Sequence, residues 1–400
     1  MKEWPDMKKL RQYKRFPWHG GNQGQLHRNG DAFFPAMLHA ISEAREFILL
    51  EMYLVESGRV TTGFIDALLQ AARRGVKVWL LFDAFGSLGL ASHDAGRLSH
   101  PNLQLAFFNP FHFWRLFNVD SLFRDHRKLL VIDGKRAFVG GTGLADGFDP
   151  KVSPHGYWRE TMVEVQGPVV GDWVMSFRQI WRRATRAELP LAEFVVIPPA
   201  GTLRGRVAIS CAPIHREIKR SFFVQARRAR ARVWLATPYF IPSGKIRRTL
   251  RNAARNGVDV RVLVPGGFSD HPVMTLIGRR FYPRLLLSGV RIFEYQPRFL
   301  HYKAVLCDNW ISLGSANFDR WNMRWNQEAN QEILDAEFAE GFAGMFADDC
   351  AEAVEIRMAD VQKPGWAGRI QYWFWSRLDR LIAYLSHSRF HKQNPFEGEE

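Results

Sequence analysis

The chain has 400 residues, enough for two hydrophobic cores, and carries 55 lysine and arginine residues against 40 aspartate and glutamate residues. The formal net charge of +15 predicts attraction to a polyanion, either nucleic acid or an anionic lipid surface. Three scattered cysteines argue against a disulfide framework or a zinc site and fit a reducing cytoplasm. The charged amino terminus is unlike a secretory signal, and no run approaches the roughly 18 apolar residues of a membrane span.

In chain order, the first predicted elements are a segment of helical character, an apolar strand at residues 47–53 and a helix that ends near residue 74. Gly75 suits the position just after a helix, and another strand follows it. This alternation of strands and helices indicates an α/β fold.

The next feature is a densely aromatic stretch at residues 111–122, which includes Phe113 and Trp114. Large apolar groups just ahead of a candidate catalytic histidine suggest a ligand with an apolar part. The alternative is that these rings form a core between two lobes, because aromatic residues commonly dominate cores.

A strand-like stretch follows at residues 126–133, where His126, Lys128 and Asp133 bear the side chains of interest. Residues i and i+2 of a strand face the same way, so the imidazole and the ammonium group are expected side by side. A single His-x-Lys pair is more often structural than catalytic, so its meaning depends on whether it recurs.

Proline and glycine interrupt the periodic pattern at residues 186–206, which predicts a boundary there. The sequence therefore predicts a first lobe at residues 1–195, a linker at 196–206 and a second lobe at 207–360. Residues 361–400 follow as a separate carboxyl-terminal segment.

The second half repeats the first. A strand-like run at residues 233–239 parallels residues 47–53, and residues 253–260, with Gly257, parallel residues 71–78. His126 lies 16 positions after Pro110, whereas the corresponding distance in the second half is 4, so the first half carries an insertion of 12 residues.

The second half also repeats the motif, as His301, Lys303 and Asp308. Two such matches indicate one bipartite site with two histidines and two lysines. That set suits displacement at an anionic phosphorus, because one neutral imidazole can attack, the other can carry protons, and the cations stabilise charge on oxygen. This chemistry requires no metal and no cofactor.

Apolar and aromatic residues recur at helical spacing near the carboxyl end, with arginines between them; they are Trp366, Ile370, Trp373, Phe374, Leu378, Leu381, Ile382 and Leu385. This pattern is typical of an amphipathic helix at a membrane interface. A helix docked on the second lobe would show the same pattern, so both interpretations stay open.

The paired motifs resemble those of the phospholipase D superfamily. Their surroundings resemble bacterial cardiolipin synthases of the type without amino-terminal membrane spans. The likeness extends over about residues 30–335, and it also includes residues 124–128, 140–141, 158–161, 237–242, 269–272 and 314–319. The resemblance implies two similar α/β/α sandwich lobes with the active site between them, and metal-independent transfer of a phosphatidyl group through a phosphohistidine.

The resemblance also implies roles for individual residues. His126 is the expected nucleophile and His301 the acid and base, although the reverse is open because coupled imidazoles share their titration. Lys128 and Lys303 would bind the non-bridging phosphate oxygens.

Further residues are expected around this centre. By resemblance, Ser315 and Asn317 would add hydrogen-bond donors for the substrate. Glu160 and Glu328 match the family's carboxylates behind the histidines, where a carboxylate fixes the tautomer and stabilises the imidazolium. Asp133 and Asp308 belong to the catalytic motifs, but their place beyond the strands suggests that they brace the following turns.

The chain departs from the family pattern in two places. Gly143 stands where relatives often have asparagine, which removes one phosphate donor or leaves its work to backbone N–H groups. Residues 321–322 are Trp-Asn, where relatives often have Arg-Ser.

These observations favour a cardiolipin synthase that converts two phosphatidylglycerol molecules into cardiolipin and glycerol. We expect a peripheral protein on the cytoplasmic face of a bacterial inner membrane, with phosphatidylglycerol and the anionic lipid surface as partners rather than nucleic acid. The alternative is another phosphodiesterase of the superfamily, either a phospholipid hydrolase or a nuclease, for which the positive charge would serve a nucleic-acid groove. A membrane-bound scaffold with a degenerate site fits poorly with two complete His/Lys pairs.

Overall fold

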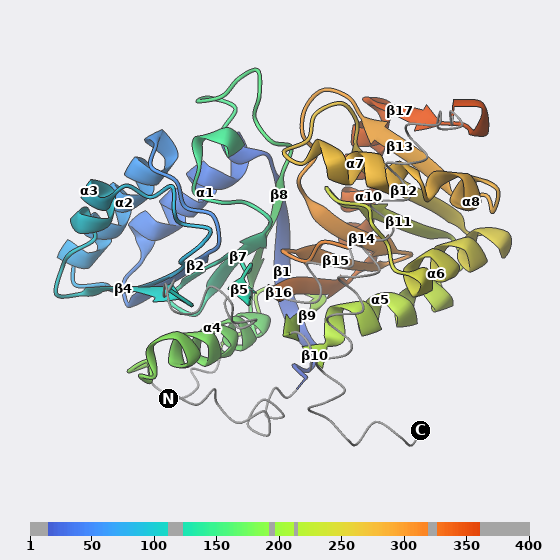
Figure 1. Ribbon diagram of the computed structural model, residues 1–400. Coiled ribbons are helices and arrows are strands. Elements are labelled where there is room, and N and C mark those ends of the chain that lie inside the picture. Colours follow the sequence, from blue (N-terminus) through green and yellow to red (C-terminus); the bar gives the residue numbers. More distant parts are fainter. Residues whose placement is uncertain (1–14, 111–122, 192–196, 212–214, 319–325, 361–400) are drawn as a thin grey trace, which may run out of the picture.

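Two β-sheets, one built mainly from each half of the chain, form the centre of the molecule (Figure 1). The computed structural model describes residues 15–110, 123–191, 197–211, 215–318 and 326–360. The aromatic insertion at 111–122, the Trp-Asn pair at 321–322 and the carboxyl-terminal segment at 361–400 lie outside the described residues.

The first sheet combines parallel and antiparallel strands. Its order is β4 (Leu103–Phe108), β3 (Lys77–Asp83), β2 (Phe47–Met52), β6 (Leu129–Ile132), β7 (Arg136–Gly140), β8 (Thr161–Gln166) and β1 (His19–Arg28). Strands β2, β3 and β4 are parallel, so their carboxyl ends meet at one edge. Residues that follow these strands are thereby brought together.

The second sheet repeats this order. It runs β17 (Ala353–Ile356), β13 (Arg291–Tyr295), β12 (Asp259–Pro265), β11 (Arg232–Ala236), β14 (Lys303–Cys307), β15 (Trp310–Gly314), β16 (Asn326–Leu334) and β9 (Leu203–Cys211). Strand β1 pairs with both β8 and β9 and so joins the two sheets. Two short strands, β5 (Arg124–Asp125) and β10 (His215–Arg216), pair with β16 and β9. The internal duplication predicted from the sequence is thus a repeated sheet.

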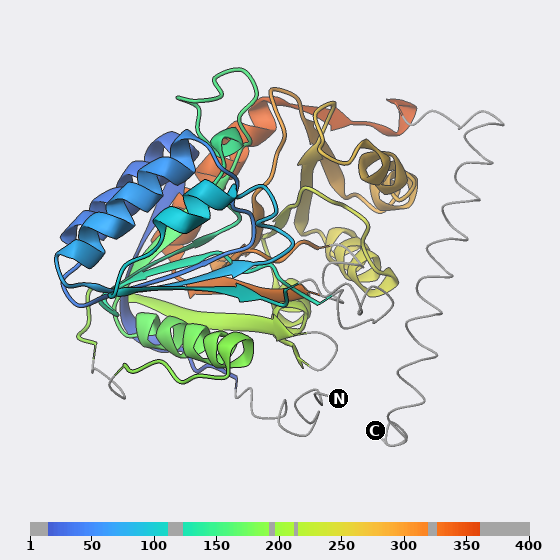
Figure 2. The same cartoon turned by 60° about the vertical axis from the view of Figure 1, so that its left-hand side comes forward.

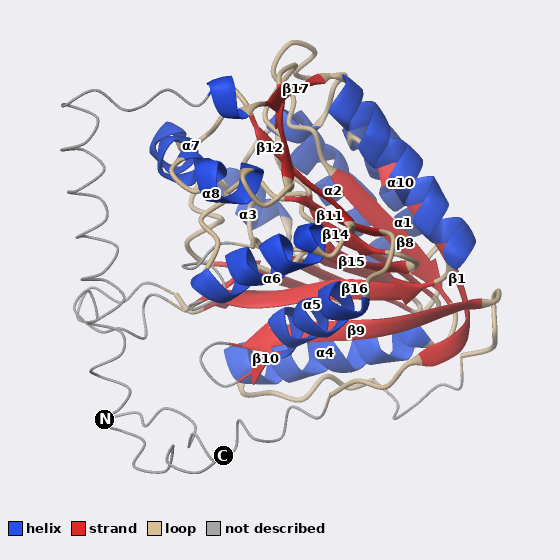
Figure 3. Ribbon diagram, turned by 90° about the vertical axis from the view of Figure 1, so that its right-hand side faces the viewer, coloured by secondary structure: helices blue, strands red, loops and turns tan. Residues whose placement is uncertain are grey.

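Helices cover both faces of each sheet, as the α/β/α prediction requires. Figure 2 shows α1 (Gly30–Glu43) and α2 (Arg59–Arg73) above the first sheet and α4 (Val169–Thr185) below it. In the second half, α5 (Glu217–Arg228) and α6 (Gly244–Arg255) lie side by side (Figures 1 and 3). The remaining helices are α3 (Ser92–Arg97), α7 (Pro272–Arg279), α8 (Tyr282–Leu286), α10 (Ala336–Ala351) and the 3-10 turns Asp146–Phe148 and Met358–Asp360.

The buried apolar residues of the described ranges form three cores. One lies under α1 and α2, and its counterpart lies under α5 and α6. The third core is shared, because α4, α10 and the inner faces of both sheets contribute to it. Burial of this shared core holds the two halves in one orientation, and a site between them depends on that orientation.

Strand β2 matches the strand predicted at residues 47–53, and the two predicted helix ends are confirmed. Helix α2 ends at Arg73 and is followed by Gly75 at φ +96°, and α6 ends at Arg255 and is followed by Gly257 at φ +83°. A positive φ is the backbone conformation that glycine adopts without strain. Within the described residues, no helix combines the length and the apolar character needed to cross a bilayer.

Two boundaries differ from the sequence-based expectation. Strands β6 and β14 begin at Leu129 and Lys303, so the first residues of each motif precede the strand. The reason is that the backbone there bonds to the opposite half, as described below. Strand β9 begins at Leu203, inside the segment expected to be a linker at 196–206.

Candidate active site

Each motif histidine is hydrogen-bonded to a glutamate of the other half. His126 Nδ1 lies 3.1 Å from Glu328 Oε2, and His301 Nδ1 lies 2.6 Å from Glu160 Oε2. Both carboxylates are fully buried. Because Nδ1 is occupied in both rings, Nε2 is the nitrogen left for chemistry. The site is therefore completed only when the two halves come together.

Backbone hydrogen bonds also join each histidine to the other half. His126 N donates to the carbonyl of Gln327 at 3.0 Å, and His301 N donates to the carbonyl of Arg159 at 2.9 Å. Gln327 and Arg159 directly precede the two glutamates, so the same short segments hold the histidine backbone and its carboxylate. These bonds also explain why β6 and β14 begin only after the histidines.

The two lysines lie beside their histidines, as the spacing predicts. Lys128 Nζ donates to the carbonyl of His126 at 2.6 Å. Lys303 Nζ donates to the carbonyl of His301 and lies 3.1 and 3.0 Å from its two ring nitrogens. Both ammonium groups are almost completely buried, and burial strengthens their attraction for a phosphate oxygen.

Burial also lowers the pKa of these cationic groups. The pKa of Lys128 falls to about 7, chiefly through desolvation and with a contribution from the charge on Lys303. Desolvation and the Lys303 charge lower the pKa of His301 to about 4. The pKa of His126 is also well below its usual value, because of burial and both lysines. Both imidazoles are thus neutral at neutral pH, as a nitrogen nucleophile must be.

The two glutamates differ in charge state. Burial raises the pKa of Glu328 to about 8, although Lys128 and Ser315 oppose the shift. Burial also acts on Glu160, but Lys303 and the hydrogen bond from His301 outweigh it and hold the pKa of Glu160 below its usual value. At neutral pH, Glu160 is an anion, whereas Glu328 is largely protonated.

The loops after β7 and β15 supply the remaining polar groups. Ser315 Oγ donates to Glu328 Oε2 at 2.5 Å, so this hydroxyl positions the carboxyl group instead of standing free for the substrate. Asn317 is buried, and its Oδ1 has no hydrogen-bond partner among the described residues. A Cβ on Gly143 would lie 2.7 Å from Leu54 Cβ and 2.8 Å from the Leu54 carbonyl oxygen, so only glycine fits there.

The motif aspartates lie at equivalent turns. Asp133 accepts backbone hydrogen bonds from residues 45–47 at 2.8–2.9 Å, and Asp308 accepts them from residues 230–232 at 2.9–3.0 Å. These bonds lower the pKa of Asp308 despite its partial burial. Each aspartate fastens the turn after its motif strand to the start of the neighbouring strand, β2 or β11.

Comparison with known proteins identifies the family. The family model described as "Cardiolipin synthase, PLD-like domain" matches residues 37–181 and 223–350. The chain is 36% identical to cardiolipin synthase A of Pseudomonas putida (strain W619) over 375 residues, which cover 92% of this chain and 76% of the relative. The chain belongs to the PLD-like cardiolipin synthase family.

Other relatives agree with this assignment. The probable cardiolipin synthase YwiE of Bacillus subtilis (strain 168) is 31% identical over 345 residues, which cover 86% of this chain and 69% of the relative. The finer resemblance, to the type without amino-terminal spans, stays a prediction.

Solved structures support the fold. Phosphatidylserine synthase of Haemophilus influenzae superposes with a TM-score of 0.66 at 13% identity, covering 95% of this chain and 98% of that chain. Polyphosphate kinase of Porphyromonas gingivalis gives a TM-score of 0.55 at 14% identity, covering 90% of this chain and 53% of the other. The mixed α/β fold is therefore shared well beyond recognisable sequence similarity.

In this member of the cardiolipin synthase family, aromatic rings pack around the histidines, which the sequence did not predict. Tyr53 lies 4.7 Å from His126 between ring centroids. Three rings surround His301, namely Phe148, Trp158 and Phe299 at 5.4, 4.9 and 5.6 Å. Two sequence signals point to them, because Tyr53 ends a predicted strand and Trp158 stands two residues before Glu160.

A buried ion pair supports the His301 side and was also missed. Arg159 Nε and Nη2 donate to Asp349 at 2.9 and 2.8 Å, and Tyr302 Oη donates to Asp349 at 2.9 Å. The Arg159 carbonyl is the acceptor for His301 N, so this pair fixes the segment that holds His301. No local pattern reveals it, because Arg159 and Asp349 are 190 residues apart.

Proposed function

We propose that the protein is a cardiolipin synthase that transfers a phosphatidyl group from one phosphatidylglycerol to another and releases glycerol. Family membership and relatives named as cardiolipin synthases support the activity. The observation that carries the mechanism is the crossed pairing of His126 with Glu328 and of His301 with Glu160. It places both imidazoles in one buried site and holds Nδ1 of each ring at a carboxyl group, which leaves the reaction to Nε2.

In the first step, Nε2 of His126 attacks the phosphorus of one phosphatidylglycerol. The new P–N bond forms as the P–O bond to glycerol breaks. His301 reacts in its protonated form, gives the proton on Nε2 to the departing oxygen and is left neutral. His301 is the better proton carrier because Glu160 is anionic and stabilises its imidazolium form. The products are free glycerol and a phosphatidyl group on His126.

In the second step, a hydroxyl of the second phosphatidylglycerol attacks the same phosphorus. His301 takes the hydroxyl proton, the P–O bond of cardiolipin forms and the P–N bond to His126 breaks. Atoms and protons balance over the two steps without a cofactor or a metal. Water in place of the second lipid would give phosphatidic acid, so the site must favour the alcohol.

The lysines and Asn317 stabilise the negative charge that develops on the phosphate oxygens. Lys128 and Lys303 are preorganised by their bonds to the histidine carbonyls, so they do not need to reorient during the reaction. Asn317 offers a buried amide for the same oxygens. Gly143 has no side chain to donate a hydrogen bond, so in the first half Lys128 must stabilise the charge on the phosphate oxygens.

The location follows from the substrate. Phosphatidylglycerol is a membrane lipid, so the protein acts at a membrane surface. We place it as a peripheral protein on the cytoplasmic face of a bacterial inner membrane.

The deciding experiment is incubation of the purified protein with labelled phosphatidylglycerol, with and without phosphatidylethanolamine, followed by separation of the lipids. We expect labelled cardiolipin and free glycerol. Phosphatidic acid alone would indicate a phospholipid hydrolase. Cleavage of an oligonucleotide without any lipid product would indicate a nuclease and contradict the proposal.

A further inference from the structure

Helices α5 and α6 carry an excess of positive charge that their position in the fold does not explain. Together they contain nine basic residues and one acidic residue. Their counterparts in the first half, α1 and α2, contain two basic and three acidic residues. The two pairs cover equivalent faces of equivalent sheets. Since the shared architecture does not require this charge, it points to a contact that only the second half makes.

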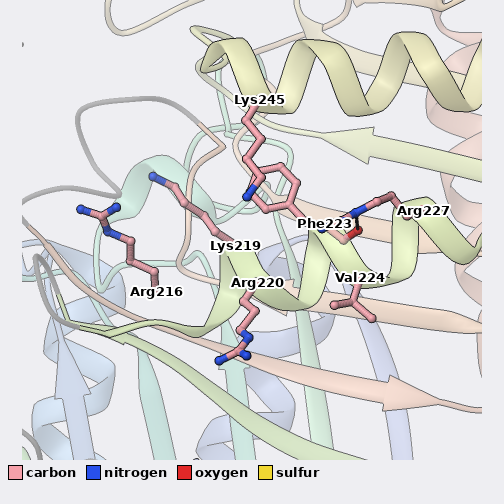
Figure 4. Close-up of a pocket in the computed structure, with 7 residues that line it drawn as sticks. All are labelled: Arg216, Lys219, Arg220, Phe223, Val224, Arg227 and Lys245. Carbon is pink, nitrogen blue, oxygen red and sulfur yellow. Dashed lines mark hydrogen bonds between the residues drawn. The ribbon is translucent and has the colours of Figure 1, made fainter. Parts of the chain in front are cut away.

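The charge surrounds a hollow of about 300 Å³ on the surface of α5. Figure 4 shows Lys245 reaching from α6 toward the ring of Phe223 on α5, and its Nζ lies 4.5 Å from the ring centroid. The other lining residues are Arg216, Lys219, Arg220, Val224 and Arg227. A second hollow between the same helices shares Arg227 and Lys245 with the first. The groove thus combines cationic walls with an apolar floor.

Three of these cations are available to a partner. Arg220, Lys245 and Arg248 are exposed, and none of them forms an ion pair with any residue in the described part of the chain. Cations that line a concave surface raise the local concentration of anions there.

The helix that lines the groove also supports the active site. On its inner side, α5 packs Phe222 against Phe318 at 5.4 Å between ring centroids, and Phe318 directly follows Asn317. Phe318 N also donates to Thr237 Oγ1 in the loop that leads from β11 to α6. The basic groove therefore lies on the outer side of α5, and the inner side of α5 supports the loop that carries Asn317.

Exposed apolar residues lie on loops at the sheet edge where α6 also begins, because α6 follows β11 and β11 is parallel to β12. Phe85 and Leu88 follow β3 and are 48% and 70% exposed, and Phe268 follows β12 and is 55% exposed. These loops occupy equivalent positions at the carboxyl ends of parallel strands. The loop after β3 packs against the site. A Cβ on Gly86 in this loop would lie 2.1 Å from the carbonyl oxygen of Tyr53, whose ring contacts His126. Apolar groups beside a cationic groove are typical of a surface that binds a lipid interface.

We propose that the α5–α6 groove and the apolar loops after β3 and β12 form a docking face for an anionic bilayer. The groove takes lipid phosphates, and Leu88 and Phe268 enter the boundary between headgroups and acyl chains. This docking would hold the edge that carries the site against the membrane. The inference rests on the proposed lipid substrate, but vesicle binding tests it without any turnover.

The test compares two sets of charge reversals in the full chain. The first set is Arg220→Glu, Lys245→Glu and Arg248→Glu in the groove. The matched control is Arg45→Glu, Arg59→Glu and Arg73→Glu, which reverses three exposed charges on α2 and on the segment that follows α1. Binding is measured by sedimentation with vesicles of phosphatidylcholine alone and of phosphatidylcholine with phosphatidylglycerol.

The groove set should lose roughly 100-fold in affinity for the anionic vesicles, and the control set should lose far less. A third variant, Leu88→Ser with Phe268→Ser, should weaken binding to both kinds of vesicle. All three variants should keep wild-type turnover of a short-chain phosphatidylglycerol dispersed in neutral detergent. Absence of cardiolipin from every protein, with vesicle binding as described, would overturn the proposed function but not the docking face.

Two outcomes would overturn the docking face. They are wild-type vesicle binding by the groove set and equal losses in the groove and control sets. If the groove set binds vesicles like the wild type but loses affinity for a duplex oligonucleotide, the groove would be assigned to nucleic acid.

Discussion

The two half-sites share a backbone plan and differ in charge. In both, a histidine is hydrogen-bonded to a glutamate across the molecule, a lysine lies beside it and an aspartate fastens the turn that follows. Yet the glutamate of one half-site has a lowered pKa, and that of the other has a pKa of about 8. Duplication therefore preserves geometry, while the immediate neighbours decide the electrostatics.

The neighbours that differ can be named. A Cβ on Gly141 would lie 2.5 Å from Glu160 Oε2, so the absence of a side chain lets this carboxylate approach the backbone. At the equivalent position, Ser315 fills that space and donates its hydroxyl to Glu328. Glu160 instead accepts from the Thr161 backbone N–H at 2.8 Å. The bond from Ser315 lowers the pKa of Glu328 but does not outweigh burial, whereas Lys303, His301 and Thr161 together outweigh burial at Glu160. The first half thus supplies an anion to His301, and the second supplies a more neutral carboxyl group to His126.

The strongest test of this asymmetry is removal of each histidine. His126→Ala and His301→Ala should each lower phosphatidylglycerol turnover roughly 10⁴-fold or more, because nucleophile and proton carrier act as a unit. Phosphatidyl-p-nitrophenol separates the roles, since its leaving group needs no proton. With this substrate, His301→Ala should release a burst of nitrophenol and retain a phosphatidyl adduct on His126, detected by mass spectrometry. A burst from His126→Ala instead would reverse the two roles.

The glutamates should respond unequally to neutralisation. Glu160→Gln should lower kcat at pH 7 by roughly 100-fold or more, because it removes the anion that stabilises protonated His301. Glu328→Gln should cost only about 10-fold, since glutamine resembles the protonated carboxyl group already present below pH 8. Above pH 8, Glu328 of the wild type ionises, so the ratio of the wild-type kcat to the kcat of Glu328→Gln should change. Equal losses at pH 7 would show that the charge difference does not matter to the reaction.

The pH dependence should reveal Lys128. This group must be protonated to bind a phosphate oxygen, and burial lowers its pKa to about 7. The free enzyme's kcat/KM should therefore fall as the pH rises through about 7. In Lys128→Arg the guanidinium stays charged, so the decrease in kcat/KM should move to higher pH. The maximum value of kcat/KM should be lower than in the wild type, because arginine changes the geometry. A fall that keeps its position in Lys128→Arg would belong to Glu328 and contradict the assignment.

The smallest effect concerns Gly143, which lacks the amide of Asn317. Gly143→Asn should not add a phosphate donor, and it should lower the free energy of unfolding by about 1–3 kcal/mol because the new side chain meets Leu54. Urea denaturation measures this change. Gly156→Asn serves as the control, since a Cβ there has no neighbour within 4 Å. Increased activity without loss of stability would show that the first half can accept the amide.

Much of the fold was predictable from local pattern. The strand at residues 47–53 and the helix ends before Gly75 and Gly257 follow from periodicity and glycine chemistry, which involve only neighbouring residues. The His-x-Lys spacing likewise placed each lysine beside its histidine. The strand limits at Leu129 and Lys303 were not predictable, because they depend on hydrogen bonds from the opposite half.

The sequence by itself determined which groups are present: two histidines, two lysines and the carboxylates that accompany them, in two similar repeats. The tertiary structure alone decided that each histidine uses the glutamate of the other repeat, across 202 residues for His126 and 141 for His301. It also decided which glutamate is charged and gathered the cations of α5 and α6 into one groove. The physical reason is that hydrogen bonds and pKa values depend on distance in space and on burial, and neither follows from position along the chain.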